Sequence, residues 1–394
     1  MSAPPPPPAW TAADARAVTQ LMLLVVAWRV VTALVAFLVN VTFPLDRPEQ
    51  FTVLGTTHHF LDPFARYDAG WYFGIASRGY QWVEGGRNNL AFFPAFPWLM
   101  GMVGRLFGGT QGDVYFGGIV VSWIASVVAV GFVYATARLD LPAARAWDAA
   151  LLTFVFSFAF FFGLIYSEGL FLCGLAAAIF GLRTRRWWLG AAAGALVTAT
   201  RVNGIMALPA FLWLAWRAAG PDPRERSRAL LAAVATSAGF FAYCVFNWAL
   251  TGDPFEWYHA ITRWGYYPGT SVTTNPLAAF VSNLASRPYE YMVNEHPAPY
   301  DVMNGVFPMA MAVTLPVLWW RLGAGYGLLI AANLALPLSS GQFEGLGRYC
   351  AVLFPFQIWL ASVVPDGGRP LVFAGYGVLY AIALTMFTTL HTLY

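Results

Sequence analysis

The sequence predicts an all-α polytopic membrane protein, a bundle of about eleven transmembrane helices with two long outer loops. Of the 394 residues, 59% are hydrophobic and only 10% are charged, whereas soluble domains carry about 25% charged residues. The mean hydropathy is +0.58, and the aromatic share of 17% suits the Trp and Tyr belts that form at membrane surfaces. We therefore expect residues 1–394 to form one membrane domain.

Eleven apolar runs are separated by turns that contain polar residues, Gly or Pro. The runs lie at about residues 18–41, 114–137, 147–165, 169–182, 187–200, 205–218, 229–250, 306–320, 323–338, 349–364 and 371–393. A Pro-rich cytoplasmic tail, residues 1–16, is predicted at the N-terminus, with a helix that starts at Thr11. It lacks the basic region and the small-residue cleavage site of a secretory signal, so the first span is expected to stay as an anchor.

The arginines predict how these spans are oriented. With the N-terminus in the cytoplasm, the short inner loops are rich in arginine and the short outer turns hold only Arg201 and Arg348, which satisfies the positive-inside rule. The inner set is Arg138, Arg145, Arg183, Arg185, Arg186, Arg217, Arg224, Arg226, Arg228, Arg321 and Arg369.

Two long polar segments then lie outside, residues 42–112 and residues 251–305. Within the first, residues 89–107 contain Pro94 and Pro97 and are interpreted as re-entrant, because a further crossing would invert every later loop. The titratable side chains of the outer loops and turns therefore converge on one membrane face. Any chemistry is expected there.

Asp68 is the first candidate for that chemistry. It lies among aromatic residues just outside the first span, where an isolated carboxylate is suited to act as a general base. The alternative is that Asp68 only caps a short helix that begins at Ala69. Glu168 interrupts a long apolar run and needs a partner or a function, because an unpaired buried carboxylate costs several kcal/mol. Its alternative role is to mark the turn between two spans.

The later outer turns contain further polar residues. Arg201 and Asn203 occupy one turn, and Arg348 lies in a Gly-rich turn where its guanidinium is well placed to hold a phosphate. The alternative for Arg348 is a simple ion pair with Glu344. The second long loop has an aromatic cluster around His259, which is typical of lids, of sugar-stacking surfaces and of segments in the headgroup layer.

Several other classes of site and protein are disfavoured. His58, His59 and Asp62 have metal-ligand spacing, but Phe60, Leu61 and Pro63 between and beside them disfavour a regular helix, so no metal is predicted. The three cysteines, Cys173, Cys244 and Cys350, fall in apolar runs and predict no disulfide framework. A net charge of +3 is too small to indicate nucleic acid. A transporter and a non-catalytic scaffold remain alternatives, although the two halves show no evident repeat.

The motifs of the outer loops and turns resemble a known family. Tyr67-Asp68-Ala69-Gly70-Trp71-Tyr72, with Ile75-Ala76, Gly79-Tyr80, Ala91-Phe92-Phe93-Pro94 and Pro97, is similar to the first outer loop of PIG-V-type mannosyltransferases. Tyr166-Ser167-Glu168, Thr200-Arg201-Val202-Asn203-Gly204, and Arg348-Tyr349 with Phe354-Pro355 follow in the family's order. The resemblance covers about residues 29–360. The chain departs from the pattern at Tyr67, where Trp is usual, and at Gly169, where a small polar or acidic residue is common.

This resemblance implies a GT-C membrane glycosyltransferase that takes mannose from a polyprenyl-phosphate-mannose donor. The acceptor would be a hydroxyl of a lipid, glycan or protein on the extracytoplasmic face, and Asp68 would be the base of an inverting transfer. Arg348 and Arg201 would bind the donor phosphate. Expected substrate-binding residues are Arg66, Tyr67, Trp71, Tyr72, Glu168, Asn203, Glu344, Tyr349 and His259. No cofactor is implied, and the alternative donors carry arabinose or glucose. The composition favours a bacterial plasma membrane over the endoplasmic reticulum.

Overall fold

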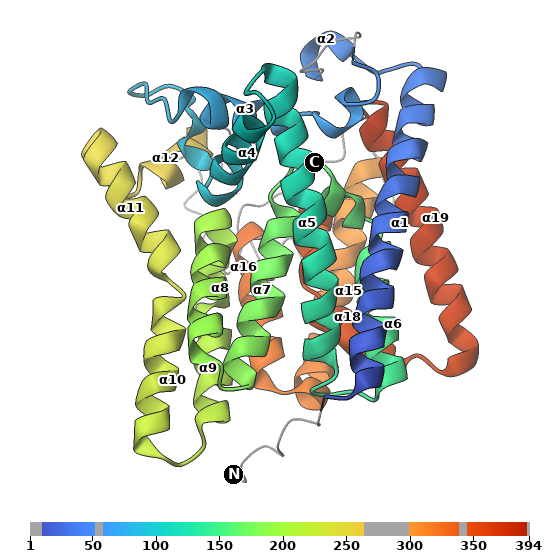
Figure 1. Cartoon of the computed structure of the whole chain (residues 1–394), viewed down its shortest axis with the longest axis vertical. Coiled ribbons are helices and arrows are strands. Elements are labelled where there is room, and N and C mark those ends of the chain that lie inside the picture. The colour runs from blue at the N-terminus through green and yellow to red at the C-terminus, as the bar shows by residue number, and fades with distance from the viewer. Residues whose placement is uncertain (1–9, 52–57, 264–298, 339–344, 392–394) are drawn as a thin grey trace.

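The computed structural model describes residues 10–51, 58–263, 299–338 and 345–391, and every element in these ranges is helical (Figure 1). Helix α1 (Ala12–Thr42) and helix α5 (Gln111–Ala137) run side by side along the length of the bundle. The all-helical membrane class that the composition predicted is confirmed for the described residues. Helices α3 (Ala69–Arg78) and α4 (Ala95–Leu106) lie at the end of the bundle opposite the start of α1 (Figure 1).

The start of α1 confirms the predicted helix start at Thr11. The Thr11 hydroxyl accepts a hydrogen bond from the Asp14 backbone N–H at 3.2 Å, and the Thr11 N–H donates to the Asp14 carboxylate at 3.0 Å. This capping box satisfies two of the backbone donors that a helix start leaves without partners. The helix then continues for 31 residues, long enough to cross a bilayer.

The count of eleven spans is not confirmed. Within the described ranges, five helical segments are long and apolar enough to cross a membrane. They are α1, α5, η4 with α9 (together Val202–Ala219), α15 (Pro299–Leu322) over Val302–Leu322, and η5 with α19 (Arg369–Thr388), together Asp366–Thr388. A sixth is the pair α10 (Pro223–Ala235) and α11 (Ala238–Thr251), which is bent by 41°. At that bend the Thr236 and Ser237 hydroxyls donate to carbonyls of the preceding turn, which competes with the helical hydrogen bonds.

The remaining helices of the bundle are shorter. They are α6 (Ala143–Val155), α7 (Glu168–Arg183), α8 (Trp187–Thr200), α16 (Ala324–Leu338), α17 (Leu346–Ala351) and α18 (Pro355–Val363). The predicted span 349–364 is therefore not one continuous helix, because it breaks between α17 and α18. Pro355 explains this break, since proline lacks the N–H that would continue the ladder and disfavours helical backbone in the residue before it.

The predicted span 147–165 is also interrupted. Helix α6 ends at Val155, and the chain continues through the short 3-10 helix η3 (Ala159–Gly163) before α7 begins. Side chains of the two long spans satisfy the carbonyls that this break leaves: Arg29 donates to Ala159 at 3.0 Å and Ser126 donates to Phe162 at 2.6 Å. Because of this break, α7 begins inside the bundle, where its first residue, Glu168, is buried.

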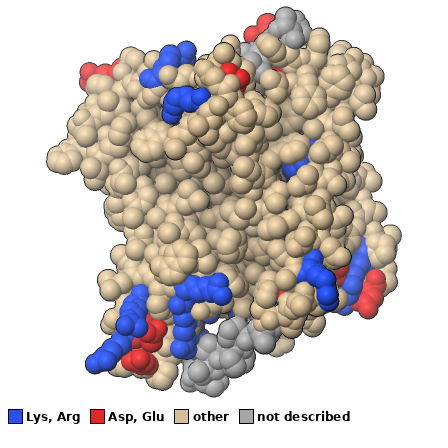
Figure 2. Space-filling model, viewed as in Figure 1, with Lys and Arg blue, Asp and Glu red and all other residues tan. Residues whose placement is uncertain are grey.

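Charged residues gather mainly at the two ends of the molecule, and Figure 2 shows a broad uncharged band between them. Such a band is the surface expected to face lipid. Helix α1 begins at the same end as the turn between α7 and α8, which holds Arg185 and Arg186. The end of α9 (Leu208–Ala219) and the start of α10, which holds Arg224, Arg226 and Arg228, also lie there (Figure 1). This end of the bundle is here called the arginine-rich end, and the orientation of the bundle in the membrane stays a prediction.

The segment predicted to be the first outer loop, residues 42–112, contains η1 (Asp62–Phe64), α3 (Ala69–Arg78), η2 (Asn89–Ala91) and α4 (Ala95–Leu106), after the short α2 (Pro48–Phe51). Helix α4 has 12 residues, which is about 18 Å at 1.5 Å per residue, too short to cross the roughly 30 Å apolar core alone. It packs against α3 and α5. The re-entrant assignment of residues 89–107 stays a prediction.

Candidate functional site

Asp68 immediately precedes α3, and the helix begins at Ala69 as the sequence predicted. The alternative in which Asp68 caps this helix is nevertheless wrong, because its side chain makes no capping hydrogen bond. Instead, Oδ2 of Asp68 accepts a hydrogen bond from Nη1 of Arg348 at 2.8 Å, across 280 positions of the sequence. The carboxylate is thus directed away from its own helix and toward α17. Arg348 lies within that helix and not in the turn that the sequence predicted, because the helix already begins at Leu346.

The backbone before Asp68 makes a tight turn. Tyr67 has a φ of +52°, in the left-handed region that side-chain-bearing residues rarely adopt, and its ring packs against Phe387 at 5.5 Å. Arg66 is fully buried and anchors the turn through an ion pair with Asp62 at 2.6 Å and a hydrogen bond to Asn40 at 2.7 Å. Arg66 therefore stabilises the turn that positions Asp68.

Glu168 is the first residue of α7 and is completely buried. It forms an ion pair with Arg201, which lies between α8 and η4, and its Oε1 lies 3.8 Å from Nε of Arg348. Asp68, Arg348, Glu168 and Arg201 therefore form a line of alternating charges, here called the charge quartet. Four segments that are distant in sequence supply its members, so only the folded bundle brings them together.

The charge quartet is electrically balanced, with two arginines and two carboxylates. Burial alone would lower the pKa of Arg348, but the nearby carboxylates of Asp68 and Glu168 raise it well above the ordinary value. Burial would also lower the pKa of Arg201, but the nearby Glu168 carboxylate outweighs burial, so the pKa of Arg201 is raised as well. Both guanidinium groups remain positively charged at any physiological pH. A site with two fixed cations in a low-dielectric setting is suited to hold a phosphate.

Aromatic and hydroxyl groups surround the two arginines. The Arg201 guanidinium lies over the Tyr349 ring at 4.7 Å, and the Arg348 guanidinium lies over the Tyr166 ring at 5.6 Å. The Ser167 hydroxyl lies 3.4 Å from Nη1 of Arg201 and 3.1 Å from the Tyr72 hydroxyl. The sequence had placed Ser167 in a motif but not among the site residues, and its position next to Glu168 was the signal available.

Not all predicted site residues join the charge quartet. Trp71 stacks on Phe92 with 6.0 Å between ring centroids. Asn203 is buried and donates to Asn333 at 3.2 Å, and His259 is half exposed and lies 3.2 Å from Asp253. Glu344 lies outside the described residues.

Asp62, one member of the weighed metal motif, faces Arg66 rather than the two histidines before it. Burial raises its pKa despite the neighbouring guanidinium. Among the residues that the structure describes, no three His, Cys, Asp or Glu side chains come together in a way that suits a metal ion. Cys244 and Cys350 are buried, Cys173 is partly buried, and all three are free thiols.

The described part of the predicted second outer loop contacts the predicted first one, since α12 packs against η2. Helix α12 (Glu256–Arg263) carries the buried Glu256, which accepts hydrogen bonds from Arg263 at 2.5 Å and from Asn88 at 3.2 Å. Trp257 packs against Phe93 in the same region. Sequence reasoning missed Asn88 and the role of Glu256, and only their long-range contact reveals it.

The broken helices and the charge quartet define an integral membrane protein with a buried ionic site at one end. The model of the family described as Mannosyltransferase (PIG-V) matches residues 15–248, more than half of the chain. The chain therefore belongs to this mannosyltransferase family, which confirms the resemblance seen in its motifs. No curated protein matches the chain significantly.

Two solved structures of an Archaeoglobus fulgidus oligosaccharyltransferase are similar at low level. The apo form has 16% identity and a TM-score of 0.45, with 93% of this chain and 56% of that chain covered. The complex with an inhibitory peptide and a dolichol-phosphate has 14% identity and a TM-score of 0.41, with 93% and 56% covered. This chain thus spans little more than half the length of that enzyme.

Proposed function

We propose that this mannosyltransferase family member moves a mannosyl residue from a polyprenyl-phosphate-mannose donor to an acceptor hydroxyl, with inversion, on the extracytoplasmic face. The acceptor is a glycolipid, a glycan or a protein. The observation that carries the proposal is the charge quartet, which combines a carboxylate with two fixed cations at one end of the bundle. Asp68 is its general base, and Arg348, supported by Arg201, binds the donor phosphate.

The reaction needs only one carboxylate. The acceptor oxygen attacks the anomeric carbon from the side opposite the phosphate while Asp68 takes its proton, and the bond between that carbon and the phosphate oxygen breaks. The electron pair of that bond leaves with the phosphate, where the arginine charge offsets it. Phosphate is a good leaving group, so no second carboxylate is required as an acid.

The ion pair between Asp68 and Arg348 adds a condition to this mechanism. Asp68 accepts a hydrogen bond at 2.8 Å from Nη1 of Arg348, the same guanidinium that is proposed to bind the phosphate. The donor phosphate therefore competes with Asp68 for Arg348, and its arrival releases Asp68 toward the acceptor. Glu168, which is fully buried, keeps its contact with Arg201.

Transfer is tested with purified protein in liposomes and radiolabelled polyprenyl-phosphate mannose. We expect Asp68→Asn to lower transfer by about 100- to 10,000-fold, the usual contribution of a general base, without loss of folding. Asp46→Asn, which alters a partly exposed carboxylate of the first outer loop, serves as the matched control and keeps its activity. Full activity of Asp68→Asn would overturn the assignment of the base. A panel of arabinose and glucose donors decides between sugars.

Competition for Arg348 is tested by binding of polyprenyl phosphate without sugar. We expect Asp68→Asn to bind it roughly tenfold more tightly than the unaltered protein, because a charged hydrogen bond of about 1.5 kcal/mol no longer opposes the phosphate. Arg348→Gln should bind it more weakly. Weaker or equal binding by Asp68→Asn would contradict the competition while leaving the transfer assay to judge the base.

A further inference from the structure

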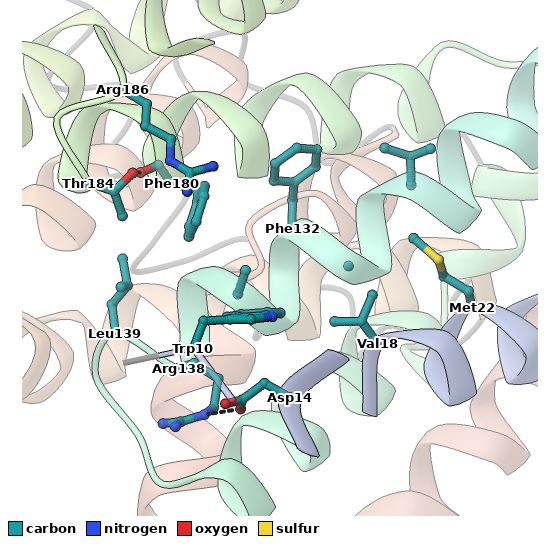
Figure 3. A pocket seen from close by; sticks show the side chains of 13 residues that line it. Trp10, Asp14, Val18, Met22, Phe132, Arg138, Leu139, Phe180, Thr184 and Arg186 are labelled. Atoms are coloured by element: carbon teal, nitrogen blue, oxygen red, sulfur yellow. Dashed lines mark hydrogen bonds and ion pairs between the residues drawn. The ribbon is translucent and has the colours of Figure 1, made fainter. Parts of the chain in front are cut away.

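A cavity of about 600 Å³ lies at the arginine-rich end of the bundle, between α1, α5 and α7 (Figure 3). It is formed by the first turns of α1 and the last turns of α5 and α7, far along these helices from the charge quartet. Its lining residues are Trp10, Asp14, Val18, Met22, Val128, Gly131, Phe132, Ala135, Arg138, Leu139, Phe180, Thr184 and Arg186. The proposed transfer reaction gives this cavity no role.

The lining changes character along the bundle axis. The polar residues Asp14, Arg138 and Arg186 come from the extreme ends of the helices, while Met22 and Val128 lie further inside. From Asp14 to Met22 the chain climbs eight residues of α1, which is about 12 Å at 1.5 Å per residue. The cavity thus has a polar mouth and an apolar interior. A lipid in one membrane leaflet has the same order, with its headgroup at the membrane surface and its acyl chains further inside.

Among the residues that the structure describes, one arginine at the mouth has no carboxylate as a partner. Arg138 is matched by Asp14, with Nε of Arg138 at 2.8 Å from Oδ1 of Asp14. The guanidinium of Arg186 lies over the Phe180 ring at 5.5 Å, and its side chain makes no hydrogen bond or ion pair with the residues that the structure describes. Figure 3 shows Arg186 and Phe180 on the side of the cavity opposite Asp14. An anionic group at the mouth would complement Arg186.

We propose that this cavity binds an anionic phospholipid of the surrounding membrane. One acyl chain fills the apolar interior between Val18, Met22 and Phe132, and the headgroup phosphate contacts Arg186. Trp10, which is 52% exposed at the mouth, is the residue type that favours the headgroup level of a bilayer. The apolar interior favours an acyl chain over a sugar, and the arginine at the mouth favours an anionic lipid over a zwitterionic one.

The proposal is tested by native mass spectrometry of the full-length protein in mild detergent, titrated with phosphatidylglycerol or with phosphatidylcholine of the same acyl chains. We expect phosphatidylglycerol to bind at least fivefold more tightly, and Arg186→Gln to remove that preference. Arg224→Gln, which alters an exposed arginine at the same end but not in the lining, should keep it. Equal binding of the two lipids by the unaltered protein would overturn the proposal.

A second pair of variants tests the apolar interior. Val128→Trp fills the cavity and should reduce phosphatidylglycerol binding about tenfold, whereas Ile124→Trp, one turn earlier on the outer surface of α5, should leave it unchanged. Retention of phosphatidylglycerol binding by both Val128→Trp and Arg186→Gln would overturn the site. Polyprenyl phosphate is the comparison ligand, and loss of its binding in Arg186→Gln with phosphatidylglycerol unaffected would assign the cavity to that lipid instead. The assay reads binding directly, so it does not depend on transfer activity.

Discussion

Glu168 contacts both arginines of the charge quartet and is its most deeply buried member. Removing water from a carboxylate is costly, and the two guanidinium groups offset that cost only while the set stays balanced. Glu168 therefore fixes the positions of Arg201 and Arg348 before any phosphate binds. Glu168 does lie at the turn before α7, as the alternative interpretation predicted, but it also forms ion pairs there.

A substitution at this residue has a predictable cost. We expect Glu168→Gln to destabilise the protein by about 3–5 kcal/mol, because it leaves a buried positive charge without compensation. The double variant Glu168→Gln with Arg201→Met restores the charge balance and should recover part of that loss. Thermal unfolding in detergent, followed by tryptophan fluorescence, measures both. A single variant as stable as the unaltered protein would contradict this account of the charge quartet.

At the scale of elements, two glycines set the contact between α4 and α5. A Cβ on Gly117 would lie 2.6 Å from the backbone N of Gly104, and a Cβ on Gly104 would lie 2.5 Å from Cα of Val114. Helix α4 also approaches α3 closely, since a Cβ on Gly101 would lie 2.9 Å from the Ala76 carbonyl oxygen. Helix α4 is therefore wedged between the helix that follows Asp68 and a long span of the bundle.

This close packing predicts opposite effects for two glycines of one helix. Gly117→Ala should destabilise the protein by about 1–3 kcal/mol, because the added methyl group forces α4 away from α5. Gly112→Ala, in the first turn of α5 where a Cβ meets nothing within 4 Å, should be neutral or slightly stabilising. Melting temperatures of the two variants measure the difference. Equal melting temperatures would show that α4 adapts freely.

Transfer activity gives a second measurement on the same pair of variants. A displaced α4 moves α3 and the turn that presents Asp68, so we expect Gly117→Ala to lose activity even below its melting temperature. Gly112→Ala should retain it.

At the scale of the whole molecule, the charge quartet and the arginine-rich turns lie at opposite ends of the bundle. Helix α3 starts next to Asp68 at one end, and the first turns of α10, which hold Arg224, Arg226 and Arg228, lie at the other end (Figure 1). With the N-terminus in the cytoplasm, the site faces outward. This orientation remains a prediction and has a direct test.

Two matched cysteine substitutions, in a background without the three native cysteines, determine the orientation of the bundle in the membrane. We expect Ser77→Cys, exposed on α3, to react with a membrane-impermeant maleimide in intact cells. Ser227→Cys, exposed on α10, should react only after the membrane is permeabilised. The reverse pattern would place Asp68 in the cytoplasm and contradict the proposed extracytoplasmic transfer.

Sequence alone determined the membrane class, the helix start at Thr11 and the short list of charged residues that lie at helix ends. These follow from local causes, namely the cost of charge in lipid, the capping box and the pattern of apolar runs. It also predicted that Asp68, Glu168, Arg201 and Arg348 share one face, because alternating spans place every second turn on the same side.

Only the tertiary structure decided which of these charges touch. Asp68 is paired with Arg348 rather than capping α3, and Glu168 contacts both Arg201 and Arg348. It also decided where spans break, as at Val155, since the carbonyls freed there depend on donors from α1 and α5. Ion pairs and broken helices are stable only when distant segments supply the compensating group, and no local pattern specifies which segment will do so.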